Sequence, residues 1–234
     1  MGNGGNPLAL PVMRGAIVQL IEELGIVLPN IIPFQYNPQK VTRSFKPWNP
    51  FEVDPTKRGA PAPMAAPFDP EETYQFTLEL DATDDLEAGN PLALISGVAS
   101  RIAAIQKLVM PTKGLIGDLI GSAKALANKP LDKQAERTTV PVALLILGLG
   151  LILPVRVTSI SIEITEFSPL LFPHMANVTL DLRVLTPEAF KCKLTPTTEF
   201  AKSAYELTRL QEDGLAILNF TNALTAAGSM LPSL

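Results

Sequence analysis

The chain has 234 residues, of which 47% are hydrophobic and only 18% are charged, so it can bury a core but carries less charge than the roughly 25% typical of soluble domains. Either neighbouring subunits cover much of its exterior, or one very apolar segment lowers the average. A net charge of −4 without a cluster of Lys and Arg argues against a nucleic-acid partner, and the single cysteine, Cys192, excludes a fold built on internal disulfides.

The N-terminal part of the chain predicts β-strands. Residues 15–22 (GAIVQLIE) suit a first strand, although their apolar positions also suit a short helix. The stretch 31–45 begins as an alternating strand with three residues on one face: Ile32, Phe34 and Tyr36. Asn37-Pro38 then interrupts it, and the alternation resumes at Val41. Because Pro38 has no N–H to donate and Asn37 favours a turn, we expect this pair to stop strand pairing at a defined register.

The next region contains the clearest strand of the chain. Residues 49–70 are rich in Pro and Ala and predict an irregular surface connection. In the following TYQFTLELDATD, two sets of residues alternate: Tyr74, Phe76, Leu78 and Leu80 on one face, and Gln75, Thr77, Glu79 and Asp81 on the other. We therefore expect one face on a core and the other on water or a polar partner.

A helix is predicted to begin at Asn90-Pro91, with Asn90 as its cap. Its apolar residues recur at spacings of three and four: Ile95, Val98, Ile102, Ile105 and Val109. We expect this stripe to pack on the sheet. Residues 110–139 predict a variable insertion with a short helix near 115–127.

Residues 140–155 lie in a stretch without charge, TTVPVALLILGLGLILPV, and hydropathy alone would predict a transmembrane helix. Three features favour a buried β-hairpin instead. Pro141 and Pro154 lie near its ends, Gly148-Leu-Gly150 suits a turn, and the second half continues into VRVTSISIEITEF, which has a period of two. In that run Val155, Val157, Ser159, Ser161 and Glu163 alternate with Arg156, Thr158, Ile160, Ile162 and Ile164.

The last third predicts one more strand and two helices. In NVTLDLRVL the apolar residues Val178, Leu180, Leu182 and Val184 point inward. Asp181 and Arg183 share the outer face, which suits either a cross-strand polar ladder or a solvated surface. Thr186-Pro187 begins a short helical turn. Thr195-Pro196 begins a longer helix to about residue 227, with apolar residues at approximate helical spacing: Phe200, Ala204, Leu207, Leu210, Ile217, Phe220 and Leu224.

Residue patterns for catalysis or metal binding are missing from the sequence. It has no H-E-x-x-H, no paired Cys, no Gly-rich phosphate loop and no G-x-S-x-G. With His174 as the single histidine, a histidine metal site is not expected, and Cys192 is interpreted as a space-filling residue rather than the partner of His174. The acidic residues Asp81, Asp84, Asp85 and Glu87 are interpreted as a solvated loop rather than a cation site. The chain is predicted to have no enzyme activity, cofactor or metal.

Three pieces of sequence carry a resemblance to a known family: Ile32-PFQYNPQKVTRS, Pro154-VRVTSISIEI, and the run from Phe167 through Asp181-LRVLTP. In this order and spacing they resemble the tube-domain family of contractile injection systems, which are phage-tail-like particles. The likeness is closest to the baseplate tube initiators, which commonly carry a LysM module. It covers about residues 14–187, with variable loops at 49–70 and 110–139.

This resemblance implies a mainly β fold with α elements (α+β), a β-sandwich or half-barrel with a packed helix and a long hairpin. We would then divide the chain into a tube-like domain, 1–190, and a C-terminal helical extension, 191–234. Phe167-Ser168-Pro169 departs from the family pattern, and aliphatic Leu144–Leu147 replace its aromatic residues. The segment 191–234 is expected to be helical and not a LysM module. We expect the helix at 195–227 to dock in place of that module.

The function implied is assembly. Six copies would form a ring that joins the spike hub to the inner tube, contacts other baseplate and sheath proteins, and templates tube polymerisation. We expect the apolar hairpin to be covered on one face by its own core and on the other by the next subunit or ring. The residues expected to form the assembly motif are Phe34, Gln35, Tyr36, Asn37, Pro38, Pro154, Arg156, Asp181 and Arg183. Gln75, Thr77, Glu79, Asp181 and Arg183 are candidates for the lumen-facing side.

The lack of a signal peptide predicts assembly in the cytoplasm, followed by incorporation into a particle that is cytoplasmic, membrane-anchored or released. Two alternatives stay open at this point. The chain could be another tube or tube-terminating ring of the same particle, or a membrane-anchored protein that uses residues 140–155.

Overall fold

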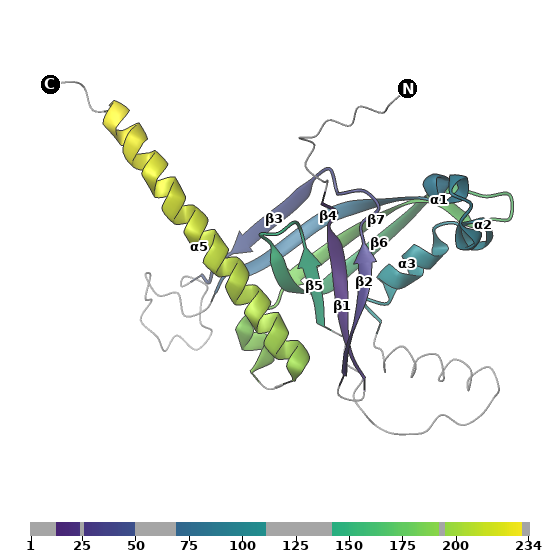
Figure 1. Ribbon diagram of the computed structural model, residues 1–234, viewed down its shortest axis with the longest axis horizontal. Coiled ribbons are helices and arrows are strands. Elements are labelled where there is room, and N and C mark those ends of the chain that lie inside the picture. The colour runs from purple at the N-terminus through teal and green to yellow at the C-terminus, as the bar shows by residue number, and fades with distance from the viewer. Residues whose placement is uncertain (1–12, 24–25, 50–68, 111–141, 192–194, 231–234) are drawn as a thin grey trace, which may run out of the picture.

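The computed structural model describes residues 13–23, 26–49, 69–110, 142–191 and 195–230 (Figure 1). Its strands are β1 (Ala16–Glu23), β2 (Ile26–Pro33), β3 (Val41–Lys46), β4 (Glu71–Asp81), β5 (Val142–Ile146), β6 (Ile152–Phe167) and β7 (Pro173–Val184). Its helices are α1 (Thr83–Glu87), α2 (Pro91–Ser96), α3 (Ala99–Gln106), a 3-10 turn (Pro187–Phe190) and α5 (Pro196–Met230). The predicted class, mainly β with α elements, is confirmed. The irregular loop and the short helix predicted within 50–68 and 111–141 lie outside the described residues.

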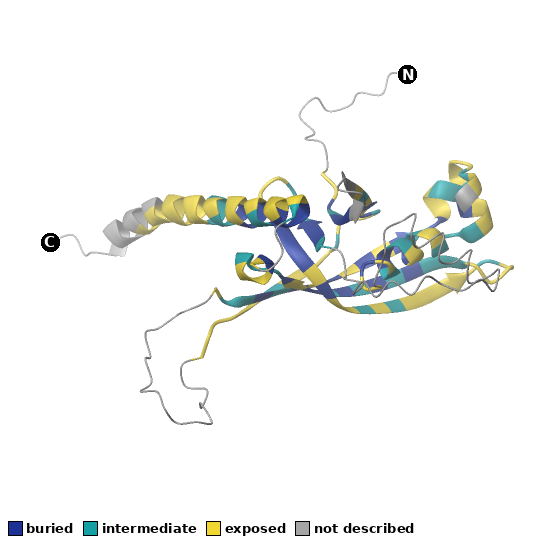
Figure 2. Ribbon diagram, turned by 90° about the horizontal axis from the view of Figure 1, so that it is seen from below, coloured by how far each residue is buried: buried dark blue, intermediate teal, exposed yellow. Residues whose placement is uncertain are grey.

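The described strands form one antiparallel sheet in the order β2-β1-β5-β6-β7-β4-β3. The sheet curves strongly, so that its two ends come together. Phe34, directly after β2 at one end, packs against Phe76 of β4 near the other end, with 5.6 Å between ring centroids. The inward residues of β4, β6 and β7 and two residues of α3, Ile102 and Ile105, form the main core. This alternation of buried and exposed residues along the strands is visible in Figure 2.

The neighbouring strands β1 and β5 are covered on both faces, which explains why β5 is apolar throughout and why β1 is apolar from Ala16 to Ile21 apart from the buried Gln19. Leu145 faces the main core, whereas Leu144 belongs to a second cluster with Val18 and Leu20 of β1. The cover over this second cluster is Ala204 of α5. The expectation that a neighbouring subunit covers the second face of the apolar hairpin is therefore wrong for this part, because the chain's own C-terminal helix lies there.

The apolar segment forms the predicted β-hairpin. β5 and β6 pair antiparallel through Leu145 and Leu153, and the turn between them contains Gly148 at φ +76°, a conformation that glycine adopts without strain. None of the described helices has the length and apolarity needed to cross a membrane. Because residues 142–146 and 152–155 are paired strands, the transmembrane-helix interpretation of this segment is wrong.

A β-bulge changes the two faces predicted for β6. Val157 pairs with Leu182 and Ser159 with Asp181, so Thr158 is an extra residue without an opposite partner. After the bulge Ile160 and Ile162 lie opposite Leu180 and Val178, on the core side. The strict alternation expected from Val155 to Ile164 is therefore wrong beyond Thr158.

Two further boundaries differ from the expectation. The strand predicted from Ile31 begins at Ile26 as β2 and ends at Pro33, so Phe34 and Tyr36 follow the strand. The helix predicted from Asn90 is broken into α2 and α3 by Gly97, which has φ +53° and lies so close to the backbone of Pro173 that a Cβ would come within 2.1 Å of its carbonyl oxygen. This break leaves Ile95 exposed, whereas Ile102 and Ile105 are buried as expected.

Candidate assembly site

Asn37 fixes the beginning of β1. Its side-chain oxygen accepts a hydrogen bond from the Gly15 N–H at 2.8 Å, and its amide nitrogen donates to the Met13 carbonyl at 2.8 Å. The Phe34 N–H donates to the Gly15 carbonyl at 2.8 Å. The Asn37 side chain thus takes the place of the strand backbone after β2 ends. This gives the predicted interruption at Asn37-Pro38 a structural role: the chain leaves the sheet here, and the side chain supplies the missing hydrogen bonds.

Gln35 forms a similar backbone-like pair with the end of β4. Its amide donates to the Asp81 carbonyl at 2.8 Å, and its oxygen accepts from the Asp81 N–H at 3.0 Å. Arg101 of α3 donates to the same oxygen at 2.7 Å and pairs with Asp85 at 2.6 Å. This cluster joins the end of β2, the end of β4 and α3 across the mouth of the curved sheet.

The acidic residues predicted to form a solvated loop lie in regular structure instead: Asp81 ends β4, and Asp84, Asp85 and Glu87 belong to the short helix α1. Asp84 and Glu87 are exposed as expected, and Asp84 accepts a hydrogen bond from the Tyr36 hydroxyl at 2.9 Å. Two hydrogen bonds from Thr83 lower the pKa of Asp81. Among the described residues there is no group of His, Cys, Asp and Glu able to hold a metal ion. Within the Phe34–Pro38 motif, the side chains of Phe34, Gln35 and Asn37 thus make contacts inside the chain, whereas Tyr36 is exposed.

The outer face of the sheet carries a polar ladder over β4, β7 and β6. Gln75 donates to Asp181 at 2.8 Å, the hydroxyls of Thr77 and Thr179 lie 2.9 Å apart, and Arg183 pairs with Glu71 at 3.4 Å. On the other side of β7 the same rows continue through Ser159, Ser161 and Glu163 of β6. Asp181 and Arg183 thus take part in a cross-strand polar ladder on a face that is also exposed to solvent, so both alternatives left open by the sequence apply. The lumen-facing candidates all lie on this one face.

Pro154 and Arg156 lie at one end of this surface. Pro154 pairs with Leu144 in the hairpin, and its carbonyl accepts the N–H of Leu185 at 2.8 Å just after β7 ends. Arg156 is exposed and lies directly opposite Arg183. Like charges at such positions repel each other, and the pair that Arg183 forms with Glu71 offsets part of this repulsion.

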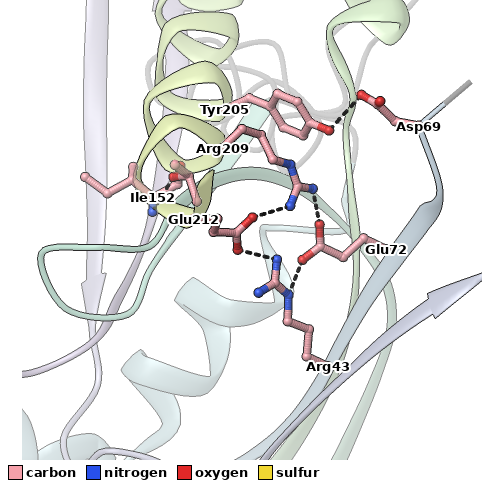
Figure 3. A network of polar contacts seen from close by, with 8 residues as sticks. Arg43, Asp69, Glu72, Ile152, Tyr205, Arg209 and Glu212 are labelled. Carbon is pink, nitrogen blue, oxygen red and sulfur yellow. Dashed lines mark hydrogen bonds and ion pairs between the residues drawn. The ribbon is translucent and has the colours of Figure 1, made fainter. Parts of the chain in front are cut away.

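A charged network that the sequence analysis missed holds α5 against the sheet (Figure 3). The carboxylate of Glu72 in β4, 1% exposed, accepts from Arg43 Nε of β3 at 2.5 Å and from Arg209 of α5. Glu212 of α5 closes the ring, at 2.6 Å from both arginines. The sequence contains an indication of this network. Glu72 lies two residues before Tyr74 and so points to the same inward face of β4, and a charge at an inward position predicts a buried partner.

Two further polar contacts position α5. The Thr208 hydroxyl accepts from the Ile152 N–H at 3.1 Å and donates to the Ile152 carbonyl at 2.8 Å. The Tyr205 hydroxyl donates to Asp69 at 2.9 Å. Hydrogen bonds and charge partners thus surround the first turns of the helix, so these turns are fixed on the sheet and do not act as a loose extension.

Two kinds of apolar surface stay exposed. Within the described part of the chain, no strand pairs with the outer edges of β2 and β3, where Ile31 and Phe45 are about half exposed or more. The β6–β7 turn carries a second set of exposed apolar side chains: Phe167, Leu170, Leu171 and Phe172. Ser168 stabilises this turn by accepting the Phe172 N–H at 3.1 Å on its hydroxyl.

No known protein-family description matches this sequence, and no curated protein matches it significantly. Cys192, the residue considered as a partner for His174, lies outside the described residues.

Proposed function

We propose that the chain is a structural ring subunit of a contractile injection system, in which six copies join the spike hub to the inner tube and template tube polymerisation. The observation that carries this proposal is the open sheet: among the described residues both edge strands are unpaired on their outer side, and the outer face of β4, β7 and β6 is polar. Unpaired edges are commonly protected by Pro or charge, and β2 carries Pro29 and Pro33 while β3 carries Lys46. Beside these residues the two edges also expose Ile31 and Phe45. Pairing of the β2 edge of one copy with the β3 edge of the next would extend the sheet around a closed ring.

The polar ladder supports the same arrangement. In a ring made this way, one face of every sheet lines the channel and the other carries the core. The ladder face has no large apolar residue in its rows from Gln75–Asp181 to Glu79–Asn177, which suits a water-filled lumen. Assembly in the cytoplasm followed by incorporation into a tail-like particle is part of this proposal, as are contacts with hub, tube and sheath proteins.

The β6–β7 turn suits contact between successive rings. Leu170 and Leu171 are each more than three-quarters exposed, and contiguous exposed apolar side chains mark interaction surfaces. A turn at the end of two long strands can reach beyond its own ring. We infer that these side chains pack on the neighbouring tube or hub ring.

The test is electron microscopy of material co-purified with a tagged full-length copy from its own cells. The proposal expects six-fold rings and one such ring per tail-like particle, at the junction of tube and spike. Many rings per particle would identify a tube protein instead. A chain that is monomeric at all concentrations and absent from any tube or sheath preparation would refute the proposal.

A matched pair of variants tests the edge pairing itself. Ile31→Lys places a charge on the exposed edge of β2 and should abolish rings while leaving the circular dichroism spectrum unchanged. Leu94→Lys changes a similarly exposed residue of α2, away from both edges, and should assemble normally. Equal assembly by the two variants would show that β2 is not the contact.

A further inference from the structure

Helix α5 is fixed to the sheet along only part of its length. Its buried side chains lie between Thr197 and Thr208: Thr197, Thr198, Ala201, Ala204, Tyr205 and Thr208. From Asp213 onward every described side chain is exposed, and Figures 1 and 2 show this part projecting from the body. Residues 214–230 carry no charge. A long helix that is apolar and projecting is normally covered by another element.

The exposed side of α5 carries a regular apolar stripe. Positions 200, 203, 207, 210, 214 and 217 are spaced alternately by three and four, and four of them hold large apolar residues: Phe200, Leu207, Leu210 and Ile217. These side chains are between 49% and 71% exposed. We call them the α5 stripe. An alternating spacing of three and four is the pattern by which one helix packs its side chains between those of a second helix, so the stripe predicts a helical partner.

Charge beside the α5 stripe distinguishes among possible partners. Glu199, Glu206 and Asp213 follow each other at intervals of seven, each close before a stripe position, and all three are exposed. Within the described residues no ion pair involves them. On the opposite flank the equivalent positions hold Ala204 and Gln211. One side of the stripe is therefore a row of negative charge. By helical spacing the nearest basic residues, Lys202 and Arg209, lie on the side of this row away from the stripe, and the opposite flank holds no basic residue.

This row disfavours a second copy of the chain and a lipid surface. Two α5 helices packed antiparallel would place their acidic rows against each other. Two α5 helices packed parallel would place each acidic row against Ala204 and Gln211 of the other helix, where it would find no charge partner. Helices that bind membranes carry Lys and Arg beside their apolar face, because membrane surfaces are commonly negative. An acidic row has the opposite sign.

We propose that the α5 stripe docks an amphipathic helix of another protein, one with an apolar seam flanked by Lys or Arg. The acidic row sets the orientation and the register of this partner, since charges beside an apolar seam select partners. The first turns of α5 are locked to the sheet through Thr208 and Arg209, so the stripe is presented on a rigid support. This inference is independent of ring formation through β2 and β3.

The test uses the full chain and two synthetic helical peptides of three heptads. Both have Leu at the seam positions; one has Lys at both flanking positions and the other has Glu. Fluorescence anisotropy should show binding of the Lys peptide and little or none of the Glu peptide. In the variant Glu206→Lys/Asp213→Lys the preference should reverse, with affinity for the Lys peptide lowered roughly ten-fold.

A matched control makes the same change of charge elsewhere. Glu163→Lys/Glu166→Lys alters two exposed residues of β6 and should leave binding of the Lys peptide within about two-fold, since the distant charges are screened. Circular dichroism checks that both variants fold. Leu210→Asp should abolish binding of the Lys peptide without changing the ring assembly tested above, which separates the two proposals.

Three outcomes would overturn the inference. The first is equal binding, or no binding, of the two peptides. The second is self-association of the chain in sedimentation experiments that is lost in Leu210→Asp, which would make a second copy the occupant. The third is co-sedimentation with phosphatidylglycerol vesicles that depends on Leu210, which would make the occupant a lipid surface.

Discussion

Replacing Glu72 with Gln removes the carboxylate that Arg43 and Arg209 share. The substitution keeps the size of the side chain and changes only its charge and one acceptor atom. Because Glu72 is buried and both arginines point at it (Figure 3), the variant leaves two cations with one carboxylate, that of Glu212. We expect the first turns of α5 to lose much of their attachment to the sheet.

The magnitude follows from the contacts. A hydrogen bond to a charged group contributes about 1.5–3 kcal/mol, and the amide oxygen introduced by Glu72→Gln can retain only one of the two, in a weaker form. Removing one partner of a fully buried ion pair costs about 3–5 kcal/mol. Arg43 and Arg209 are 29% and 27% exposed, which lowers the cost because water solvates part of each cation. We expect Glu72→Gln to reduce the free energy of unfolding by about 3 kcal/mol.

Urea unfolding followed by far-ultraviolet circular dichroism measures this loss. Hydrogen exchange adds the location: the amides of α5 between Tyr205 and Glu212 should exchange faster in the variant, whereas those of β7 should change little. Lys191→Gln serves as the control, because its pair with Glu188 is exposed on both sides and such pairs contribute about 0–1 kcal/mol.

A double-mutant cycle isolates the pair. If Glu72 and Arg209 interact as described, Arg209→Gln added to Glu72→Gln should cost at least about 1 kcal/mol less than Arg209→Gln alone. Additive costs, or a loss below about 0.5 kcal/mol for Glu72→Gln, would show that the network does not hold α5 and would refute the reasoning.

Gly97→Ala should lower the free energy of unfolding by at least about 3 kcal/mol, because it combines a left-handed backbone with a clash at the Pro173 carbonyl. Gly89→Ala, also left-handed but without neighbours within 4 Å, should cost only about 1–2 kcal/mol. Thermal unfolding compares the two variants, and equal costs would contradict the close contact. Asn37→Ala should cost about 1–2 kcal/mol and speed hydrogen exchange at the start of β1, with Asn37→Asp intermediate since it keeps the acceptor; unchanged exchange would count against this role. Burial alone would raise the pKa of Glu212, but hydrogen bonds from Arg209 and Arg43 outweigh it and lower the pKa. This stabilisation is complete above the unfolded pKa and is lost as pH falls through the folded one, so Glu212→Gln should be less stable at neutral pH and lose less on acidification; parallel pH curves would argue against the effect.

The class of the fold and most strands could be predicted because their two faces meet different surroundings. Along β4 the residues Tyr74, Phe76 and Leu78 contact the core while Gln75 and Thr77 meet water, which imposes a period of two on the sequence. The β5–β6 hairpin could be distinguished from a helix for the same reason: its second strand extends into a segment that is polar on one side.

The rest needed tertiary contacts. The bulge at Thr158 is signalled by Val157 and Ile160 standing three apart, but only pairing with β7 shows which residue is extra. The buried side of α5 is made of small residues such as Ala201 and Ala204, because the helix lies close to the sheet, and its large apolar residues point away from the body. Helical spacing reveals the stripe, but it does not indicate which side of the helix contacts the sheet.

The position of α5 over β1 and β5 also affects how the protein is made. Ala204, which covers Val18 and Leu20, leaves the ribosome more than 180 residues after them. At 5–20 residues per second this interval lasts about 10–40 s, during which α5 does not yet cover the apolar side chains of β1. We therefore expect the incomplete chain to expose apolar side chains of β1 that are buried in the finished fold.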